Sequence, residues 1–223
     1  SSQCFLEDRS GLIWVGMEQW GLYLFDRATR QFRRVETEFP ELAFLMDYSI
    51  YSLLEDTDGN IWIGTNNYGL ACFNRNNRSV KVYTNDPGNP NSIVSNHPIS
   101  LLEDRNGDLW VGTLEGLERF DRSTGKFEHH PPHGGSLPDH PGNKVSSIYE
   151  DTWGNLWVGT VECLSLLNRK DGSYRYFLRD KDIGLPVSCI YRDSNGALWV
   201  GTYYGLYCLK FPDPGNPAAR GRG

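Results

Sequence analysis

One ten-residue phrase occurs five times along this sequence. The copies are EDRSGLIWVG from Glu7, EDTDGNIWIG from Glu55, EDRNGDLWVG from Glu103, EDTWGNLWVG from Glu150 and RDSNGALWVG from Arg192. The tryptophans at their centres are 48, 48, 47 and 42 residues apart, and they are Trp14, Trp62, Trp110, Trp157 and Trp199. A period of this length is typical of repeat folds in which each unit is one supersecondary structure. The repeat therefore restricts the chain to an array of similar units.

Each unit is predicted to form four short strands. The first strand ends at the Glu-Asp pair, and Asp-x-x-Gly then makes a tight hairpin, because Asp accepts backbone hydrogen bonds and Gly allows positive φ. The second strand carries the tryptophan. Third strands begin at Leu22, Leu70, Leu117, Leu164 and Leu206. Fourth strands begin at Phe32, Val80, Phe127 and Tyr174.

The second strand is apolar throughout, as in Leu12-Ile13-Trp14-Val15, so both of its faces need cover. Radially packed blades provide that cover. We therefore predict an all-β chain forming a β-propeller of five four-stranded antiparallel blades, with the five tryptophans as its repeated core. The expected units are 1–47, 48–95, 96–143, 144–186 and 187–211, followed by a flexible Pro/Gly/Arg tail at 212–223.

The third unit, Glu103 to Phe127, and the loop before it, Asp86 to Asn96, resemble the two-component regulator propeller repeats in sensor domains of bacterial hybrid histidine kinases. The resemblance implies a periplasmic, extracytoplasmic propeller, typically seven-bladed and paired with a second propeller, that passes ligand occupancy to a kinase. It also implies further propeller blades, or a partner copy of the receptor, as protein partners.

The sequence departs from the family repeat at Met17, Cys163 and Arg192, which replace threonine, glycine and glutamate, and its last unit ends after a third strand. We expect the five units to be part of a larger propeller of about seven blades. A complete five-bladed ring with an irregular seam is the alternative.

The net charge of −6 argues against nucleic acid as a partner, and no apolar run of membrane-spanning length predicts membrane insertion. The cysteines are odd in number, are widely spaced and include no CxxC, so we expect free, mostly buried thiols. They are Cys4, Cys72, Cys163, Cys189 and Cys208.

Four histidines gather in one unit, at His129, His130, His133 and His140. A metal site is conceivable there, but the neighbouring Pro and Gly residues favour a solvated loop. The Asp-x-x-Gly turns lack the distal Glu of a calcium loop. No nucleophile, zinc or P-loop motif is present, so we expect no catalytic residue, no metal and no cofactor.

The loops between second and third strands differ among the units and share one face of a propeller. Their aromatic, amide and carboxylate side chains suit a small polar or carbohydrate-derived ligand, although loops also vary without function. The candidate ligand-binding residues are Glu18, Trp20, Asn66, Asn67, Tyr68, Glu115, Glu162, Tyr203 and Tyr204.

Three functions remain in competition. The favoured one is a ligand-sensing or ligand-binding module of a bacterial two-component receptor, without catalysis of its own. The alternatives are a propeller enzyme similar to streptogramin lyases, acting on a polar or glycan-like substrate, and a protein-interaction scaffold. No recurring His–Glu pair occupies the variable loops, which disfavours the lyase.

Overall fold

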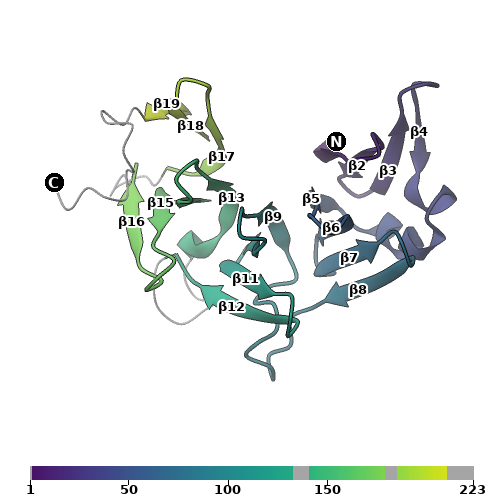
Figure 1. Cartoon of the computed structure of the whole chain (residues 1–223), viewed down its shortest axis with the longest axis horizontal. Coiled ribbons are helices and arrows are strands. Elements are labelled where there is room, and N and C mark those ends of the chain that lie inside the picture. Colours follow the sequence, from purple (N-terminus) through teal and green to yellow (C-terminus); the bar gives the residue numbers. More distant parts are fainter. Residues whose placement is uncertain (1, 133–140, 179–184, 210–223) are drawn as a thin grey trace.

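A computed structural model describes residues 2–132, 141–178 and 185–209. These residues form five antiparallel sheets arranged as the blades of a β-propeller, in an arc with the first and last blades at its two ends (Figure 1). The predicted fold class is therefore confirmed. Four sheets have four strands, and the described part of the fifth has three.

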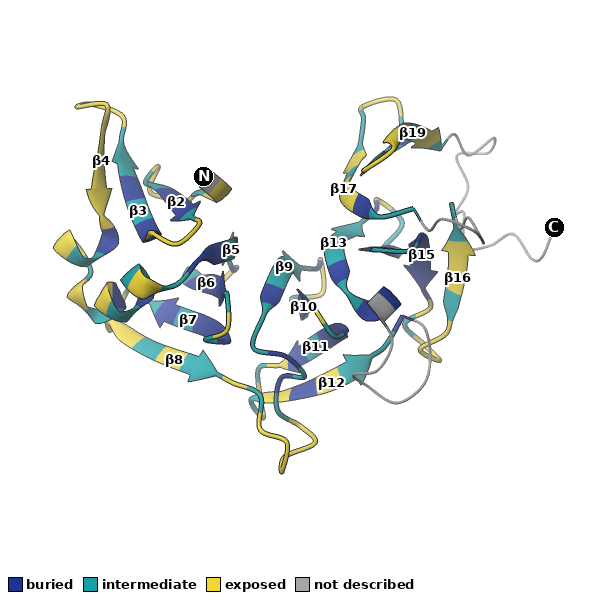
Figure 2. Ribbon diagram, turned by 180° about the vertical axis from the view of Figure 1, so that it is seen from behind, coloured by how far each residue is buried: buried dark blue, intermediate teal, exposed yellow. Residues whose placement is uncertain are grey.

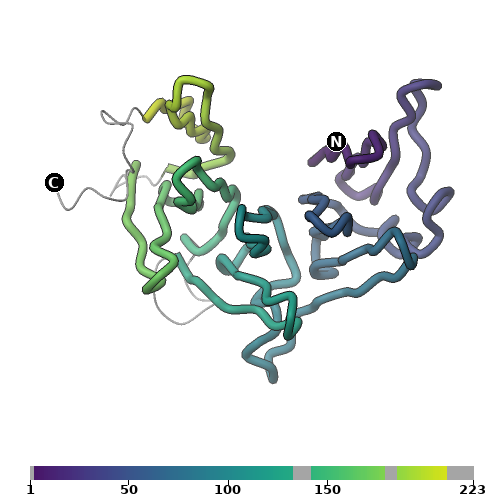
Figure 3. The backbone as a smooth tube through the Cα atoms, in the orientation of Figure 1, coloured from purple at the N-terminus to yellow at the C-terminus, as the bar shows by residue number. Residues whose placement is uncertain are grey.

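In each blade the strands follow sequence order from the concave side of the arc to its convex side (Figure 3). The innermost strands are β1 (Ser2–Glu7), β5 (Ile50–Glu55), β9 (Pro98–Glu103), β13 (Val145–Glu150) and β17 (Val187–Arg192). The second strands carry the tryptophans and are β2 (Ile13–Met17), β6 (Asn60–Thr65), β10 (Leu109–Thr113), β14 (Leu156–Thr160) and β18 (Leu198–Thr202).

The third strands are β3 (Gly21–Asp26), β7 (Leu70–Asn74), β11 (Leu117–Asp121), β15 (Leu164–Leu167) and β19 (Gly205–Leu209). The outer strands are β4 (Gln31–Arg34), β8 (Ser79–Tyr83), β12 (Lys126–His130) and β16 (Tyr174–Phe177). Three short 3-10 helices lie in the connections between blades, and they are η1 (Val35–Thr37), η2 (Pro40–Asp47) and η3 (Pro141–Asn143). No helix of the described residues has the length and apolar character needed to cross a membrane.

The hydrophobic cores lie between blades. We call the face that carries the tryptophan the trailing face, and it packs on the leading face of the next blade. Trp14, for example, joins one cluster with Ile61, Ile63 and Phe73 of blade 2. Figure 2 shows the consequence: the second and third strands of the middle blades are buried, whereas outer strands such as β4 and β16 are largely exposed.

Trp14, Trp62, Trp110 and Trp157 are buried, but Trp199 is only partly buried. All five are thus largely buried, as expected, and Trp199 is the least buried of them. The reason is positional, because in the described part of the chain no further blade covers the trailing face of blade 5.

The innermost strand of each blade lies close to the innermost strand of the next blade. This explains why a small residue, such as Ser100, stands in each innermost strand. It also explains the glycine that follows Trp-Val or Trp-Ile in each second strand, such as Gly112. The Ser100 hydroxyl donates to the carbonyl of Val145 in the next blade (3.1 Å), and a Cβ on Gly112 would lie 2.1 Å from that hydroxyl oxygen. Cys4 makes the equivalent contact to the Ile50 carbonyl (3.6 Å). Burial raises the pKa of Cys4 to about 12, so this thiol is protonated and structural. All five cysteines are free, as predicted, although Cys189 and Cys208 are exposed.

Each hairpin aspartate organises its turn and its tryptophan together. Asp56 Oδ1 accepts from the Asn60 backbone N–H (2.8 Å), and Asp56 Oδ2 accepts from Trp62 Nε1 (2.7 Å). All five blades repeat the aspartate–tryptophan bond at 2.7–3.0 Å.

An arginine at the end of the third strand joins each pair of neighbours among the first four blades. Arg122 of blade 3 donates to Asp56 of blade 2 and to Glu103 of its own blade, both at 2.7 Å. Arg75 and Arg169 make the same two contacts at the adjoining junctions. We call this arrangement the latch. Although burial raises the pKa of Asp56, bonds from Arg122, Asn60 and Trp62 hold it below its ordinary value.

We expect Trp110→Ala to destabilise the protein by about 3–5 kcal/mol, because it leaves a cavity between two blades. Trp199→Ala should cost less than about 2 kcal/mol, because less apolar surface is buried there. Urea unfolding of both variants tests this difference, and equal losses would contradict the burial pattern.

We expect Arg122→Gln to cost about 2–3 kcal/mol, because it removes the charged partner of a buried carboxylate. Arg119→Gln is a matched control on β11, the strand that directly precedes Arg122, since Arg119 pairs with the exposed Glu128 and should contribute at most about 1 kcal/mol. A loss in Arg122→Gln no larger than in this control would show that the latch is not stabilising.

Candidate functional site

The connections between second and third strands lie at the end of the blades opposite the aspartate hairpins, together with the connections between blades. The Asn66 backbone N–H donates to the Ser49 carbonyl (2.9 Å), and Tyr203 N–H donates to the Pro186 carbonyl (3.2 Å). A threonine shapes each turn of blades 2 to 5, for example Thr65, whose hydroxyl donates to the Gly69 carbonyl (2.8 Å). We call this end the loop face.

Two of the predicted stacking aromatics have structural neighbours. Tyr68 packs against Phe44 and Tyr48 of the preceding connection, with ring centres 5.3 and 4.6 Å away. Trp20, at the same position in blade 1, is 60% exposed and lines a hollow on the leading face of that blade. Tyr68 therefore lies at the junction between blades 1 and 2, whereas Trp20 is exposed at the end of the arc.

The remaining predicted residues are spread over the arc. Glu18 accepts from Gln3 (3.3 Å), and the Glu162 carboxylate packs against Gly142. Tyr203 and Tyr204 protrude, with 86% and 62% of their surface exposed. Asn66 and Glu115 are partly buried, and Asn67 is exposed at φ 68°.

The loop face places these residues on one end of the molecule but does not bring all of them together. Glu18 and Trp20 belong to blade 1, whereas Tyr203 and Tyr204 belong to blade 5, at the other end of the arc (Figure 1). Within the described residues, the candidate ligand-binding residues are therefore spread along the arc from blade 1 to blade 5.

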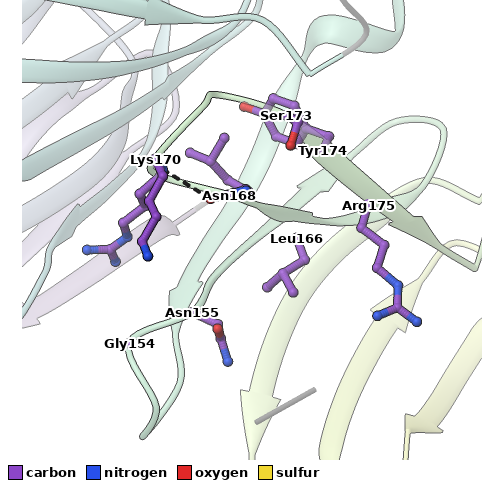
Figure 4. A pocket seen from close by; sticks show the side chains of 10 residues that line it. Gly154, Asn155, Leu166, Asn168, Lys170, Ser173, Tyr174 and Arg175 are labelled. Carbon is purple, nitrogen blue, oxygen red and sulfur yellow. Dashed lines mark hydrogen bonds between the residues drawn. The ribbon is translucent and has the colours of Figure 1, made fainter. Parts of the chain in front are cut away.

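A hollow of about 510 Å³ lies at the hairpin end of blade 4, away from the loop face. Figure 4 shows Asn155 and Gly154 on one side, and Lys170, Ser173 and Arg175 around it. The backbone N–H of Lys170 donates to the Asn168 side chain (3.1 Å). The residues that line this hollow include no carboxylate, thiol or histidine.

A buried Glu–His pair is the chemically most unusual group in the described chain, and sequence reasoning missed it. Glu118 on β11 is fully buried, and its Oε1 accepts from the Val94 backbone N–H (2.6 Å). His129 on β12 lies with Nδ1 3.7 Å from Glu118 Oε1 and with Nε2 2.9 Å from the Pro90 carbonyl. The pair thus fastens the connection between blades 2 and 3.

The prediction of a solvated histidine loop is wrong for two of its four members. His129 and His130 end strand β12, and the His130 ring packs on Trp110 with ring centres 5.2 Å apart. Strand pairing with β11 holds both residues against the blade. His133 and His140 lie outside the described residues.

The pKa values of Glu118 and His129 are both raised, which favours a pair that retains one proton. The Pro90 carbonyl can only accept, so His129 Nε2 carries a hydrogen. Nδ1 lies 3.7 Å from Glu118 Oε1, so the two groups attract each other as an ion pair when His129 is protonated. Burial raises the pKa of Glu118, and the Glu118 carboxylate in turn raises the pKa of His129.

One signal in the sequence could have revealed Glu118. Its strand position is occupied by Tyr23, Ala71, Ser165 and Tyr207 in the other units. A carboxylate at a position that the repeat keeps uncharged marks a departure specific to one blade.

The model of the two-component regulator propeller repeat matches residues 45–67, 92–115, 139–162 and 183–204. These four segments contain the second strands and hairpins of blades 2 to 5. The chain belongs to the two-component regulator propeller family. No curated protein matches it in sequence.

Solved structures agree with this family. The extracellular domain of the hybrid two-component system BT3049 from B. thetaiotaomicron is 27% identical, with a TM-score of 0.75 over 95% of this two-component regulator propeller. The match covers 28% of that longer chain. Virginiamycin B lyase from Staphylococcus aureus shares the fold, at 18% identity and a TM-score of 0.65, over 96% of this chain and 71% of the lyase.

The Glu118–His129 pair predicts a specific pH dependence. Both groups bind protons more tightly in the folded protein, so their contribution to stability is present at low pH and is lost as pH rises above the ordinary histidine pKa of about 6.5. We expect stability to fall with rising pH more steeply in the parent protein than in Glu118→Gln. Hydrogen exchange of the Val94 amide reports the same change locally.

The comparison isolates Glu118, because the other charged groups nearby are unchanged in the variant. These are Glu115, Arg119, Glu128 and His130. Equal slopes of stability against pH in the two proteins would contradict the one-proton pair.

Proposed function

We propose that the chain is a ligand-sensing propeller module of an extracytoplasmic receptor and has no catalytic activity of its own. The observation that carries this proposal is the contrast between the two ends of the blades. At the hairpin end, the repeated acidic residues of the first four blades form the latches between blades. At the loop face, side chains differ between blades, and some are free of any role in the repeat.

Tyr203 and Tyr204 best illustrate the loop face. Neither is needed for the turn, which Thr202 shapes by donating to the Gly205 carbonyl (3.0 Å). Exposed tyrosines stack on the apolar faces of sugars and donate hydrogen bonds through their hydroxyl groups. A small polar or carbohydrate-derived ligand fits this chemistry, and the likeness to an extracellular two-component domain supports an extracytoplasmic location.

We expect Tyr203→Ala combined with Tyr204→Ala to weaken binding of an oligosaccharide by about tenfold, the loss of one or two aromatic contacts. The measurement is calorimetry of the chain with a panel of neutral and acidic oligosaccharides. Tyr191→Ala is the matched control, since Tyr191 is an exposed tyrosine of the same blade, on innermost strand β17 and outside the loop face.

Absence of binding across the panel, or binding unchanged in the double variant, would count against this role of the loop face. Cleavage of an oligosaccharide by the purified chain would instead support the propeller enzyme.

A further inference from the structure

The hollow at the hairpin end of blade 4 carries an excess of positive charge. Lys170 and Arg175 line it, and Figure 4 shows their side chains on either side of Leu166. Both cationic residues are exposed to solvent. The volume of the hollow, about 510 Å³, lies within the range of small-molecule binding sites.

The other charged side chains beside the hollow already have partners. Arg169 also lines the hollow, but the two carboxylates of its latch balance its charge. Asp171 is the carboxylate of the same turn, and it accepts from the Ser173 hydroxyl (2.6 Å) and from the Asn168 amide (3.0 Å). Asp171 is not among the residues that line the hollow. The hollow therefore keeps two cationic side chains and no lining carboxylate.

The equivalent surface of blade 3 has a different charge pattern. At the positions of Asn155, Leu166 and Arg175, blade 3 has Asp108, Arg119 and Glu128. Arg119 pairs with Glu128 at 2.6 Å and lies 3.6 Å from Asp108, so carboxylates of the same blade neutralise it.

The charge of Lys170 is specific to blade 4. Its position, directly after the latch arginine, is occupied by Ala28, Asn76 and Ser123 in the first three blades. The repeat therefore does not need a cation at this position, and the fold does not explain Lys170.

This part of a blade stays exposed beside a neighbour with four strands. Arg119 lies next to Trp110 on the trailing face of blade 3, and all four strands of blade 4 are described. The side chains of Asp108, Arg119 and Glu128 are nevertheless 38%, 41% and 55% exposed. We therefore expect the same part of blade 4 to be accessible to a ligand when blade 5 packs against it.

We propose that this hollow binds a small polyanion that presents carboxylate or phosphate oxygens. Lys170 and Arg175 donate to these oxygens from two sides, in charge-assisted hydrogen bonds. The net charge of the chain is −6, so attraction of an anion is a local property of the hollow and not of the whole molecule. The site lies at the end of the blades opposite the loop face, and it is additional to the site proposed there.

Calorimetry of the full chain with citrate and with inorganic pyrophosphate tests the proposal and separates the two kinds of anionic oxygen. We expect at least one of these anions to bind. Acetate, which has a single charge, should bind at least about tenfold more weakly, because it reaches only one cation. Raising sodium chloride from about 50 to about 500 mM should weaken binding, since salt screens exposed charges.

Lys170→Ser and Arg175→Glu install the residues that blade 3 has at these positions. Each should weaken binding by at least about tenfold, through loss of one charge-assisted contact. Lys81→Glu is the matched control, because Lys81 is the counterpart of Arg175 in blade 2 and the change in net charge is the same. This control should leave the affinity within about twofold of the parent value, and thermal unfolding verifies that all three variants are folded.

The proposal is overturned if neither citrate nor pyrophosphate binds, or if Lys170→Ser and Arg175→Glu both leave the affinity unchanged. An equal loss of affinity in Lys81→Glu would show that the anion responds to the charge of the whole chain, and would overturn it too. Tyr203→Ala combined with Tyr204→Ala should not alter anion binding. The proposals for the hollow and for the loop face can therefore fail independently.

Discussion

A buried carboxylate on which a tryptophan, a hairpin and a neighbouring arginine converge is the interaction on which this propeller depends. The side chains of Asp8, Asp56 and Asp104 are fully buried. An ionised carboxylate in that position is tolerated only with charged and hydrogen-bonding partners. The backbone turn and the tryptophan come from the same blade, but the arginine comes from the next. In these three hairpins the buried carboxylate therefore has its full set of partners only when the next blade is in place.

The junction between blades 4 and 5 shows how this dependence shifts when the repeat changes. Arg192 replaces the glutamate of the latch and lies over the Trp153 ring, 4.2 Å from its centre, while donating to the Thr152 hydroxyl. Cation–π stacking takes the place of a carboxylate pair. The same geometry of sheets is retained with different chemistry, because the apolar cluster around Trp157 still fills the space between the blades.

The structure constrains the sequence of the loop face less than it constrains the hairpin end. Its turns need a threonine or glycine and a backbone contact to the adjoining connection, so their tips are free to vary. Blade 3 adds a constraint of its own, since Glu118 and His129 fasten the connection beside its turn. The loop face therefore combines protruding tyrosines on blade 5 with a connection that Glu118 and His129 fasten to blade 3.

The sequence by itself determined the repeat, the four-strand unit, the propeller class and the family. Turn chemistry and strand periodicity are local properties, and they recur in every unit. It also indicated that the thiols are free. Only the tertiary structure decided which residues meet across blades. Tyr68 suggested ligand stacking as an isolated residue, but Phe44 and Tyr48 place it at the junction between blades 1 and 2. Arg75 contacts Asp8, which lies 67 positions earlier in the sequence, and Glu118 contacts Val94 only when the connection between blades 2 and 3 packs on blade 3. Such contacts depend on the stacking of whole sheets, which no local pattern encodes.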